Sequence, residues 1–378
     1  MRAGGLRGAL AVSLCLWAAG AVSALAQDGP SGITVPTVFA PFDPNAPRCT
    51  PPPGLQKILG FAQDNERQFM QGVSRGLELA ARDRGLQYRL AQARNDAKLM
   101  IDQVQQMRTD RVGAVVAAPI DSPSMKRSLQ QLIWSGAYVG TVVPPPAIEL
   151  LNAPQYATGR VLADAAAAYI RERLRGRANV VLLTHDSLQF LAPRFTAMRD
   201  ALKDMPGVTV VADISPRTVN KEGGYEAMRT VLLAEPNIDV VLGADTVVLG
   251  ALKALREAGK ARDEQFLGGI DGEPEAVDEI KRGGPYKASV SLNSPVFAYA
   301  MGQQAADWLE GRSIPQAMDI LPSALSRANI AAYEADLADP GSVWRDTTRR
   351  AAYLKMYGNI CYDSRDRYVN FPWSSERR

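Results

Sequence analysis

Short apolar segments alternate with longer amphipathic segments along most of the chain. Residues 67–84, for example, carry Phe69, Val73 and Leu77 at four-residue spacing, which places these side chains on one face of a helix. The apolar run at 56–61 is too short for a helix and is typical of a buried strand. The pattern predicts strands at 56–61, 88–91, 112–118, 137–143, 179–184, 208–214, 240–243, 266–269 and 287–292, and helices at 67–84, 97–108, 122–135, 159–175, 194–203, 221–233, 247–258, 273–282 and 295–310.

This alternation indicates the fold class. Strands joined by helices form parallel sheets with helices on both faces. Three consecutive prolines at 144–146 interrupt the pattern, because they can continue neither a helix nor a central strand, and the alternation resumes near residue 159. The sequence therefore predicts an α/β protein with two Rossmann-like, doubly wound lobes. Residues 27–53, rich in proline, aspartate and glycine, predict an extended arm.

The first 26 residues have the pattern of a secretory signal peptide. Arg2 and Arg7 precede an apolar run at residues 9–22, and residues 24–26 (Ala-Leu-Ala) place small side chains where a signal peptidase reads them. The apolar run is short for a membrane anchor, which needs about 20 residues. We expect a mature chain that starts near Gln27 and lies in the periplasm or outside the cell.

Composition narrows the possible functions. The 378 residues, 46% hydrophobic and 22% charged, are ordinary for a soluble protein of two domains. The formal net charge is +3, and the signal segment holds two of the positive charges and no acid, so the mature chain has 3 − 2 = +1, which argues against a nucleic-acid partner. One histidine and two mature cysteines exclude most metal and Cys–His sites, and the sequence holds no phosphate loop, nucleophile elbow or dinucleotide motif. We therefore expect no enzyme activity, cofactor or metal.

The two cysteines of the mature chain, Cys49 and Cys361, lie on either side of the whole alternating region. In an oxidising compartment they can form a disulfide that joins the arm to the C-terminal segment. The alternative, two unrelated buried thiols, stays open at this stage.

Polar side chains follow several of the predicted strands. Ligands of doubly wound sheets bind beyond the carboxyl ends of the strands, so a binding site is expected at these positions. A carboxylate beside an arginine suits vicinal hydroxyl groups, because both make charge-assisted hydrogen bonds, and an aromatic ring can stack on a flat ligand face. The candidates are Phe69, Asp121, Arg194, Asp245, Asp271 and Asn293, with the loop at 63–66 beside them.

Most of these candidates also have a purely structural interpretation. Asp271 precedes a glycine and fits a turn, while Asp245 fits the cap of the following helix. Arg194 fits a surface ion pair, and Phe69 fits the apolar face of its helix. His185, the only histidine, fits a structural role.

Several motifs resemble those of one protein family. Residues 244–246 (Ala-Asp-Thr), 249–252 (Leu-Gly-Ala-Leu), 258–260 (Ala-Gly-Lys) and 269–274 (Gly-Ile-Asp-Gly-Glu-Pro) stand in the order and spacing of the periplasmic sugar-binding proteins of ABC importers, of the ribose-binding type. Phe69 and Arg194 also match positions of that family. The resemblance runs from about residue 55 to 330.

The resemblance implies a type I periplasmic binding protein fold, in which two lobes on a multi-strand hinge close on one ligand. It implies one lobe from residues 54–158 and 293–320, a second from 159–292 and 321–332, and a C-terminal extension at 333–378. It also implies ligand contacts, which are Phe69, Arg194, Asp245, Asp271 and, more loosely, Asn220.

The chain departs from that family at three places in the expected site. Val143-Pro144 stands where the family has Asp-Arg, Ala244 stands where it has Asn, and Leu292 stands where it has Gln, with Asn293 beside it. The first lobe therefore lacks part of the side chains with which the family binds a standard free hexose or pentose. A modified, larger or less hydroxylated sugar, or another small polar molecule, is expected instead.

These observations predict a solute-binding protein that captures a small polar, carbohydrate-like ligand for a membrane permease. The alternative is a periplasmic sensor with the same lobes that signals to a membrane receptor or histidine kinase. A DNA-binding repressor shares this core, but the proline-rich arm leaves no room for a helix-turn-helix. The seven aromatic residues between Trp344 and Trp373 are expected to pack on the body or to contact a partner.

Overall fold

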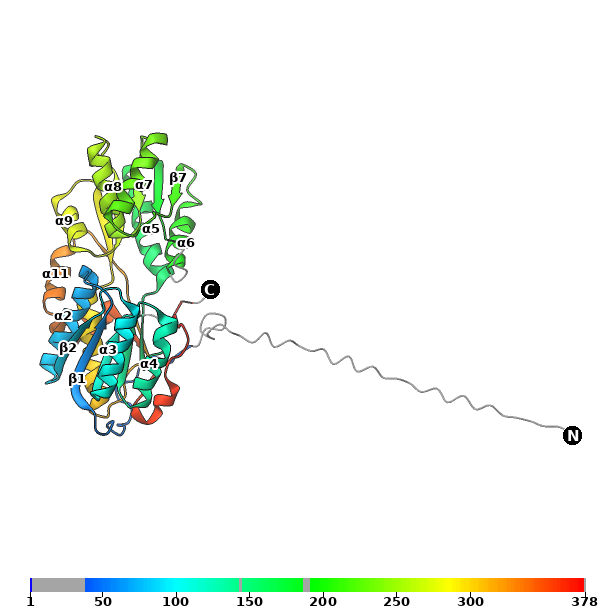
Figure 1. Ribbon diagram of the computed structural model, residues 1–378. Helices are drawn as coiled ribbons and strands as arrows, with labels where there is room; N and C mark the ends of the chain where they lie inside the picture. The colour runs from blue at the N-terminus through cyan, green and yellow to red at the C-terminus, as the bar shows by residue number, and fades with distance from the viewer. Residues whose placement is uncertain (2–37, 143–144, 186–190, 377–378) are drawn as a thin grey trace.

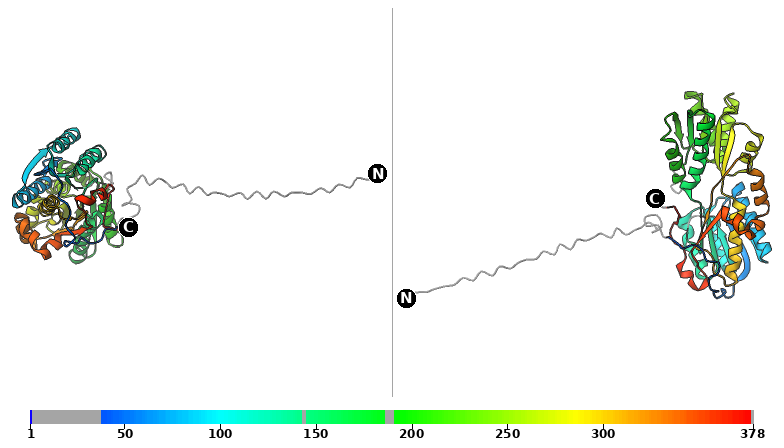
Figure 2. Two further views of the ribbon diagram at one scale, coloured as in Figure 1. Left: turned by 90° about the horizontal axis from the view of Figure 1, so that it is seen from below. Right: turned by 180° about the vertical axis from the view of Figure 1, so that it is seen from behind.

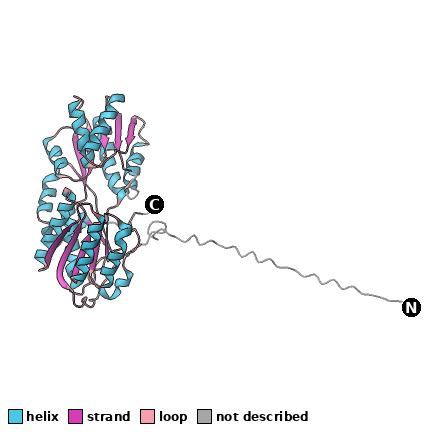
Figure 3. Ribbon diagram, in the orientation of Figure 1, coloured by secondary structure: helices cyan, strands magenta, loops and turns pink. Residues whose placement is uncertain are grey.

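The computed structural model describes residue 1 and residues 38–142, 145–185 and 191–376, which form two α/β lobes stacked end to end (Figure 1). In both lobes the helices flank a central sheet (Figure 3). The expected signal peptide, the first part of the arm and the Val143-Pro144 position lie outside the described residues. None of the helices in the described ranges is both long and apolar enough to cross a membrane.

The sheet of the N lobe has, within the described residues, seven strands in the order β13-β11-β5-β4-β3-β1-β2. Neighbouring strands are parallel except β13, which runs antiparallel to β11. The strands are β1 (Gln56–Gln63), β2 (Gln87–Gln92), β3 (Val112–Ala117), β4 (Tyr138–Val142), β5 (Glu149–Asn152), β11 (Ala317–Ile320) and β13 (Leu354–Tyr357), and the helices are α2 (Gln68–Asp83), α3 (Ala97–Thr109), α4 (Ser122–Trp134) and α10 (Ser294–Leu309).

The described sheet of the C lobe has six strands in the order β12-β10-β9-β8-β6-β7. They are parallel except for β12, which is antiparallel to β10. The strands are β6 (Ala178–Leu183), β7 (Val208–Ile214), β8 (Val240–Leu242), β9 (Phe266–Asp271), β10 (Tyr286–Ser291) and β12 (Ser323–Leu325), and the helices are α5 (Gln155–Arg173), α6 (Ala192–Leu202), α7 (Lys221–Ala234), α8 (Asp245–Glu257) and α9 (Pro274–Arg282).

Both lobes repeat the strand order 2-1-3-4-5, as β2-β1-β3-β4-β5 and as β7-β6-β8-β9-β10. This order confirms the predicted doubly wound architecture. In the described part the chain crosses between the lobes four times: after β5, after β10, after β11 and between β12 and β13. The two sheets are therefore joined by a multi-strand hinge, which the right-hand view of Figure 2 shows between the lobes.

The continuous apolar strands of the C lobe are explained by burial on both faces. Val181 and Leu183 of β6 pack into one hydrophobic cluster, while Val180 and Leu182 pack into another on the opposite face. Side chains alternate across a strand, so helices on both sides of the sheet require apolar residues at every position.

The structure differs from the predicted elements after residue 310, where none was predicted, and in the first crossing. Residues 144–158 were expected to be a crossing segment between the lobes, with no strand assigned, but β5 (Glu149–Asn152) lies there and pairs with both β4 and β11. Helix α5 begins at Gln155, four residues before the predicted start at 159. Pro154 precedes it with φ −60°, the angle that proline already favours at the entry to a helix.

The C-terminal extension packs mainly on the N lobe. It starts within α11 (Ile330–Ala338) and continues through α12 (Pro340–Arg345), α13 (Thr347–Tyr353), β13 and the 3₁₀ helix η1 (Tyr362–Arg367). A disulfide joins Cys49 to Cys361 and confirms the predicted pairing. Trp373 is buried beside Ala147 and Leu150, next to the hinge strands. Aromatic residues of the extension therefore pack on the body of the protein.

The last described residue of the extension contacts the other lobe. The Glu376 carboxylate accepts hydrogen bonds from the backbone N–H groups of Tyr156 (3.2 Å) and Ala157 (2.6 Å), at the start of α5. The first N–H groups of a helix have no partner within it and attract negative charge. The extension is thus attached to both lobes across the hinge.

Candidate functional site

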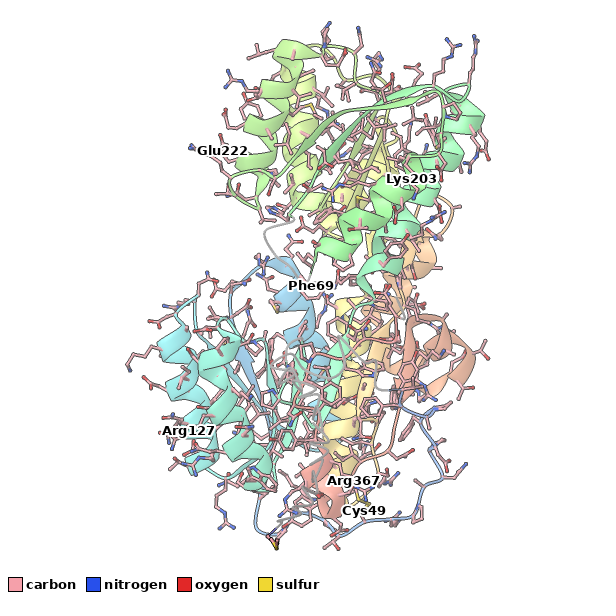
Figure 4. All side chains as sticks on the ribbon, turned by 90° about the vertical axis from the view of Figure 1, so that its right-hand side faces the viewer. Cys49, Phe69, Arg127, Lys203, Glu222 and Arg367 are labelled. Carbon is pink, nitrogen blue, oxygen red and sulfur yellow. A yellow bond between two sulfur atoms is a disulfide. The ribbon has the colours of Figure 1, made fainter. Side chains whose placement is uncertain are left out.

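The carboxyl ends of the parallel strands of both lobes face the junction between the lobes. Figure 4 shows Phe69, on the first turn of α2, at this junction. In each sheet the strand order reverses between the first and third strands, and ligands of doubly wound sheets bind at such a point. We call the residues that meet there the interlobe site, and describe them from the C lobe outward.

Arg194 on α6 is the central cation of this site. It is only 5% exposed, so it is not the surface residue that one interpretation of the sequence allowed. Its Nε donates a hydrogen bond of 2.9 Å to Oε1 of Gln155, and its Nη1 lies 3.8 Å from Oδ1 of Asp271. Burial lowers the pKa of Arg194, and the charge of Asp271 opposes this shift.

Asp271 ends β9 in an unusual backbone conformation. Its φ of 123° is in a region that side chains rarely occupy, and Gly272 follows with φ 69°. Burial raises the pKa of Asp271, while Arg194 and Arg67 lower it. Arg67 precedes α2 in the N lobe, so charges of both lobes act on this carboxylate. Within the described residues its oxygens accept no hydrogen bond, which leaves them available to a ligand.

Asp245, the first residue of α8, is fully buried beneath this pair. Its Oδ1 accepts from the Tyr286 hydroxyl (2.7 Å), and its Oδ2 accepts from the Ser289 hydroxyl (2.6 Å) and from the backbone N–H of Glu273 (2.8 Å). Burial raises the pKa of Asp245 to about 7, and these hydrogen bonds oppose the shift. Asp245 therefore fixes the turn after β9 that presents Asp271, and its role as a ligand contact stays a prediction.

Asn293 lies at the crossing from β10 to α10 with a left-handed backbone, φ 53° and ψ 49°. It is 1% exposed, and neither its Oδ1 nor its Nδ2 has a hydrogen-bond partner among the described residues. Helix α2 packs closely against Ser294, the residue after Asn293. A Cβ atom added at Gly72 of α2 would lie only 2.1 Å from the Ser294 Oγ. Asn293 therefore lies at the hinge, beside the first turns of α2, with an amide that needs a partner.

Gln63 is a second buried amide at a strand end. It is the last residue of β1, it is 1% exposed, and its Oε1 has no described partner, while Nε2 donates to the backbone carbonyl of Asn65. An unpaired polar group of this kind costs about 1–3 kcal/mol unless a ligand or water satisfies it. Gln63 and Asn293 thus offer hydrogen bonds from the N lobe and the hinge.

The other three candidates contact residues other than Arg194 and Asp271. Phe69 is half-buried and packs on Phe297, with 5.9 Å between ring centroids. Asp121, at the start of α4, accepts from the Ser124 hydroxyl. Asn220 is exposed and caps α7 through the backbone N–H of Gly223 (2.8 Å). No hydrogen bond in the described part joins any of the three to Arg194 or Asp271, so their ligand roles stay predictions.

Sequence reasoning missed two residues of the site. Gln155 positions Arg194, but it was assigned to the crossing segment before the predicted helix. Glu273 was predicted only to be part of the motif at 269–274. It is half-buried, and burial together with the charges of Asp245 and Asp271 raises its pKa to about 7. No group of possible metal ligands lies here: in the described residues the one such group contains Cys49 and Cys361, which are joined to each other.

Comparison with known proteins is consistent with this geometry. The periplasmic binding protein domain family matches residues 60–313. The ribose import binding protein RbsB of Bacillus subtilis is 25% identical over 257 residues, 65% of this chain and 79% of that protein. The xylitol-binding protein of Mycolicibacterium smegmatis is 25% identical over 262 residues, 67% of this chain and 72% of that protein.

Solved structures share the fold. An ABC transporter solute-binding protein of Bacillus halodurans with bound myo-inositol superimposes with a TM-score of 0.64 at 20% identity, over 74% of this chain and 98% of that one. A second, from Actinobacillus succinogenes with bound D-allose, has a TM-score of 0.65 at 19% identity, over 74% and 100%.

Proposed function

This chain belongs to the periplasmic binding protein domain family, and we propose that it captures a sugar or sugar-like polyol between its lobes and delivers it to the permease of an ABC importer. The observation that carries the proposal is the ion pair between buried Arg194 and half-buried Asp271 at the lobe junction, together with the unpaired amide of Asn293 at the hinge. The names of the relatives, a ribose import protein and a xylitol-binding protein, favour the same ligand class. Nothing in these comparisons favours the sensor alternative.

The geometry supports binding by lobe closure. Arg194 and Asp271 belong to the C lobe, Gln63 and Phe69 to the N lobe, and Asn293 to the hinge. A ligand that contacts all three parts gains more hydrogen bonds in the closed form than in the open form. Such differential affinity shifts the population toward closure. The loss of the family's Asp-Arg pair at Val143-Pro144 still favours a polyol or modified sugar over a standard free hexose or pentose.

A thermal-shift screen of residues 27–378 tests the proposal. The ligands are sugars, polyols, amino acids and small organic acids. At 100 times its dissociation constant, a ligand adds about 2.7 kcal/mol to the free energy of unfolding, which a melting curve resolves. We expect stabilisation by one sugar or polyol class. Stabilisation only by amino acids or acids, or by none of the compounds, would contradict the proposed ligand.

Once a ligand is found, Arg194→Ala and Asp271→Ala should each weaken its binding by about 1.5–3 kcal/mol, because each removes a charged hydrogen-bond partner. Isothermal titration calorimetry measures the change. Arg127→Ala is the matched control, since Arg127 is exposed on α4, away from the junction (Figure 4). Asp271→Asn keeps the side chain's shape and should lose less affinity than Asp271→Ala. Wild-type affinity in both alanine variants would overturn the site.

A further inference from the structure

A cavity of about 600 Å³ lies at the base of the N lobe, away from the interlobe site. Its walls come from the N-terminal arm, the end of α10 and the C-terminal extension. We call it the basal pocket. The lining residues that the argument uses are Phe42, Arg48, Arg312, Trp344, Arg350 and Lys355.

The basal pocket carries an excess of positive charge. Four of its lining residues are cations, and one lining residue, Asp307, is acidic. Asp307 is already paired with Arg84 at 2.8 Å and lies 3.8 Å from Arg312, which also pairs with Glu310 at 3.3 Å. Among the described residues, the other three lining cations form no ion pair with a carboxylate. These cations are Arg48, Arg350 and Lys355.

Arg350 gives the pocket its most specific feature. Its guanidinium lies 4.7 Å from the centroid of the Trp344 ring, and its Nη1 donates to the Trp344 backbone carbonyl (3.0 Å). The side chain is half-buried, and burial lowers its pKa with no acidic group to oppose the shift. A cation held partly out of water without an anion is unfavourable, and a bound anion would relieve this cost.

The pocket is separate from the interlobe site. Helix α10 (Ser294–Leu309) starts beside Asn293 and ends just before Arg312, and its 16 residues span about 23 Å at 1.5 Å per residue. Figure 4 likewise shows Cys49, the neighbour of Arg48, at the opposite end of the N lobe from Phe69. A ligand in one site cannot contact the residues of the other.

The two additions to the family core build most of the pocket. The family match covers residues 60–313, whereas Phe42, Arg48, Trp344, Arg350 and Lys355 lie outside it. The disulfide joins the arm to the extension, and the backbone N–H of Cys49 donates to Gly311 O (2.9 Å). The disulfide and this hydrogen bond therefore hold the arm against the extension and the end of α10, so the walls of the pocket are fixed before a ligand binds.

We propose that the basal pocket is a second binding site, for a small molecule that carries at least two carboxylate or phosphate groups. Its volume is in the range of about 300–1,000 Å³ that small-ligand sites occupy. Arginine suits such groups because its planar fork makes paired, charge-assisted hydrogen bonds. Phe42 and Trp344 supply apolar surface for the rest of the ligand.

Calorimetric titration tests this proposal. Residues 27–378 are titrated with citrate and with pyrophosphate, and sodium chloride at equal ionic strength serves as the control. Citrate represents carboxylates and pyrophosphate represents phosphates. We expect one of them to bind saturably at one site per chain. Arg350→Gln and Lys355→Gln should each weaken that binding by about tenfold, the loss of one charge-assisted contact. Lys355 is exposed, so its variant should fold even if Arg350→Gln does not.

Two controls make the result specific. Arg127→Gln removes a cation elsewhere on the N lobe and should leave anion binding unchanged. Asp271→Ala should bind the anion normally, and Lys355→Gln should keep the sugar response, so that failure of this proposal and failure of the proposed function are distinguishable. The proposal is overturned if neither anion binds beyond the chloride effect, or if all the cation variants weaken binding equally, as nonspecific attraction would.

Discussion

Replacing both Cys49 and Cys361 by serine is expected to lower the free energy of unfolding by roughly 5 kcal/mol. The disulfide closes a loop of 312 residues, and its Cα atoms lie 6.2 Å apart. In the chain-entropy description, a longer closed loop restricts the unfolded state more, so this bond is near the upper end of the usual effect. The expected Cα separation for an unstrained bridge, about 4.4–6.8 Å, includes the observed value.

Guanidinium denaturation measures the contribution of the disulfide to stability. The wild type and the double serine variant are each unfolded with and without a reducing agent. The reducing agent should lower the midpoint of the wild type to that of the variant and leave the variant unchanged. Equal midpoints for the oxidised wild type and the variant would show that the bridge does not stabilise the chain. A change in slope alone would indicate a less compact unfolded state, because the slope reports the surface exposed on unfolding.

The main elements of the fold could be predicted from local pattern. Helices such as α2 and strands such as β3 have enough residues to show their period, and each forms largely from its own sequence. β5, β11 and β13 have four residues each and lie outside the regular alternation of strands and helices. β5 and β11 also pair although they are far apart along the chain. The hydrogen bond from Asn152 to Asp319, for example, joins residues 167 positions apart.

The position of the candidate site could be predicted, but not the orientation of its side chains. The strand-end rule selected Arg194, Asp271 and Asn293, which the structure places at the lobe junction or hinge. The same rule selected Asp245, whose oxygens instead accept hydrogen bonds from its own lobe. A sequence motif gives the type of side chain, whereas its direction depends on neighbours such as Tyr286 that lie 41 residues away.

The basal pocket could not be predicted, because its residues come from three distant segments. The sequence indicated the Cys49–Cys361 bridge and an aromatic extension, and both are present. The sequence does not show that Arg48 lies close to Arg350 and Lys355 of the α13–β13 region. The folded structure, in which the disulfide joins the arm to the extension, places these cations around one pocket.

Asp245→Ala is expected to destabilise the C lobe by about 3–4 kcal/mol. The substitution leaves three donors without their acceptor: the hydroxyl groups of Tyr286 and Ser289 and the backbone N–H of Glu273. Each buried unpaired donor costs about 1–3 kcal/mol, partly offset because a buried carboxylate is also removed. Asp245→Asn should be much milder, because the amide oxygen can keep two of these bonds while the Tyr286 hydroxyl rotates to accept from the amide nitrogen.

The wild type and the Asp245→Asn variant also allow a test of how stability depends on pH. Burial raises the pKa of Asp245 from 3.8 to about 7, so between these values the folded state keeps a proton that the unfolded state has released. Stability must then fall as pH rises from about 4 to about 7, since the folded state binds more protons. Asn cannot titrate, so the stability of the wild type relative to Asp245→Asn should decrease between pH 5 and pH 8 in urea denaturation. A constant difference across this range would mean that Asp245 is already ionised at pH 5, and the hydrogen bonds would then outweigh the burial that raises its pKa.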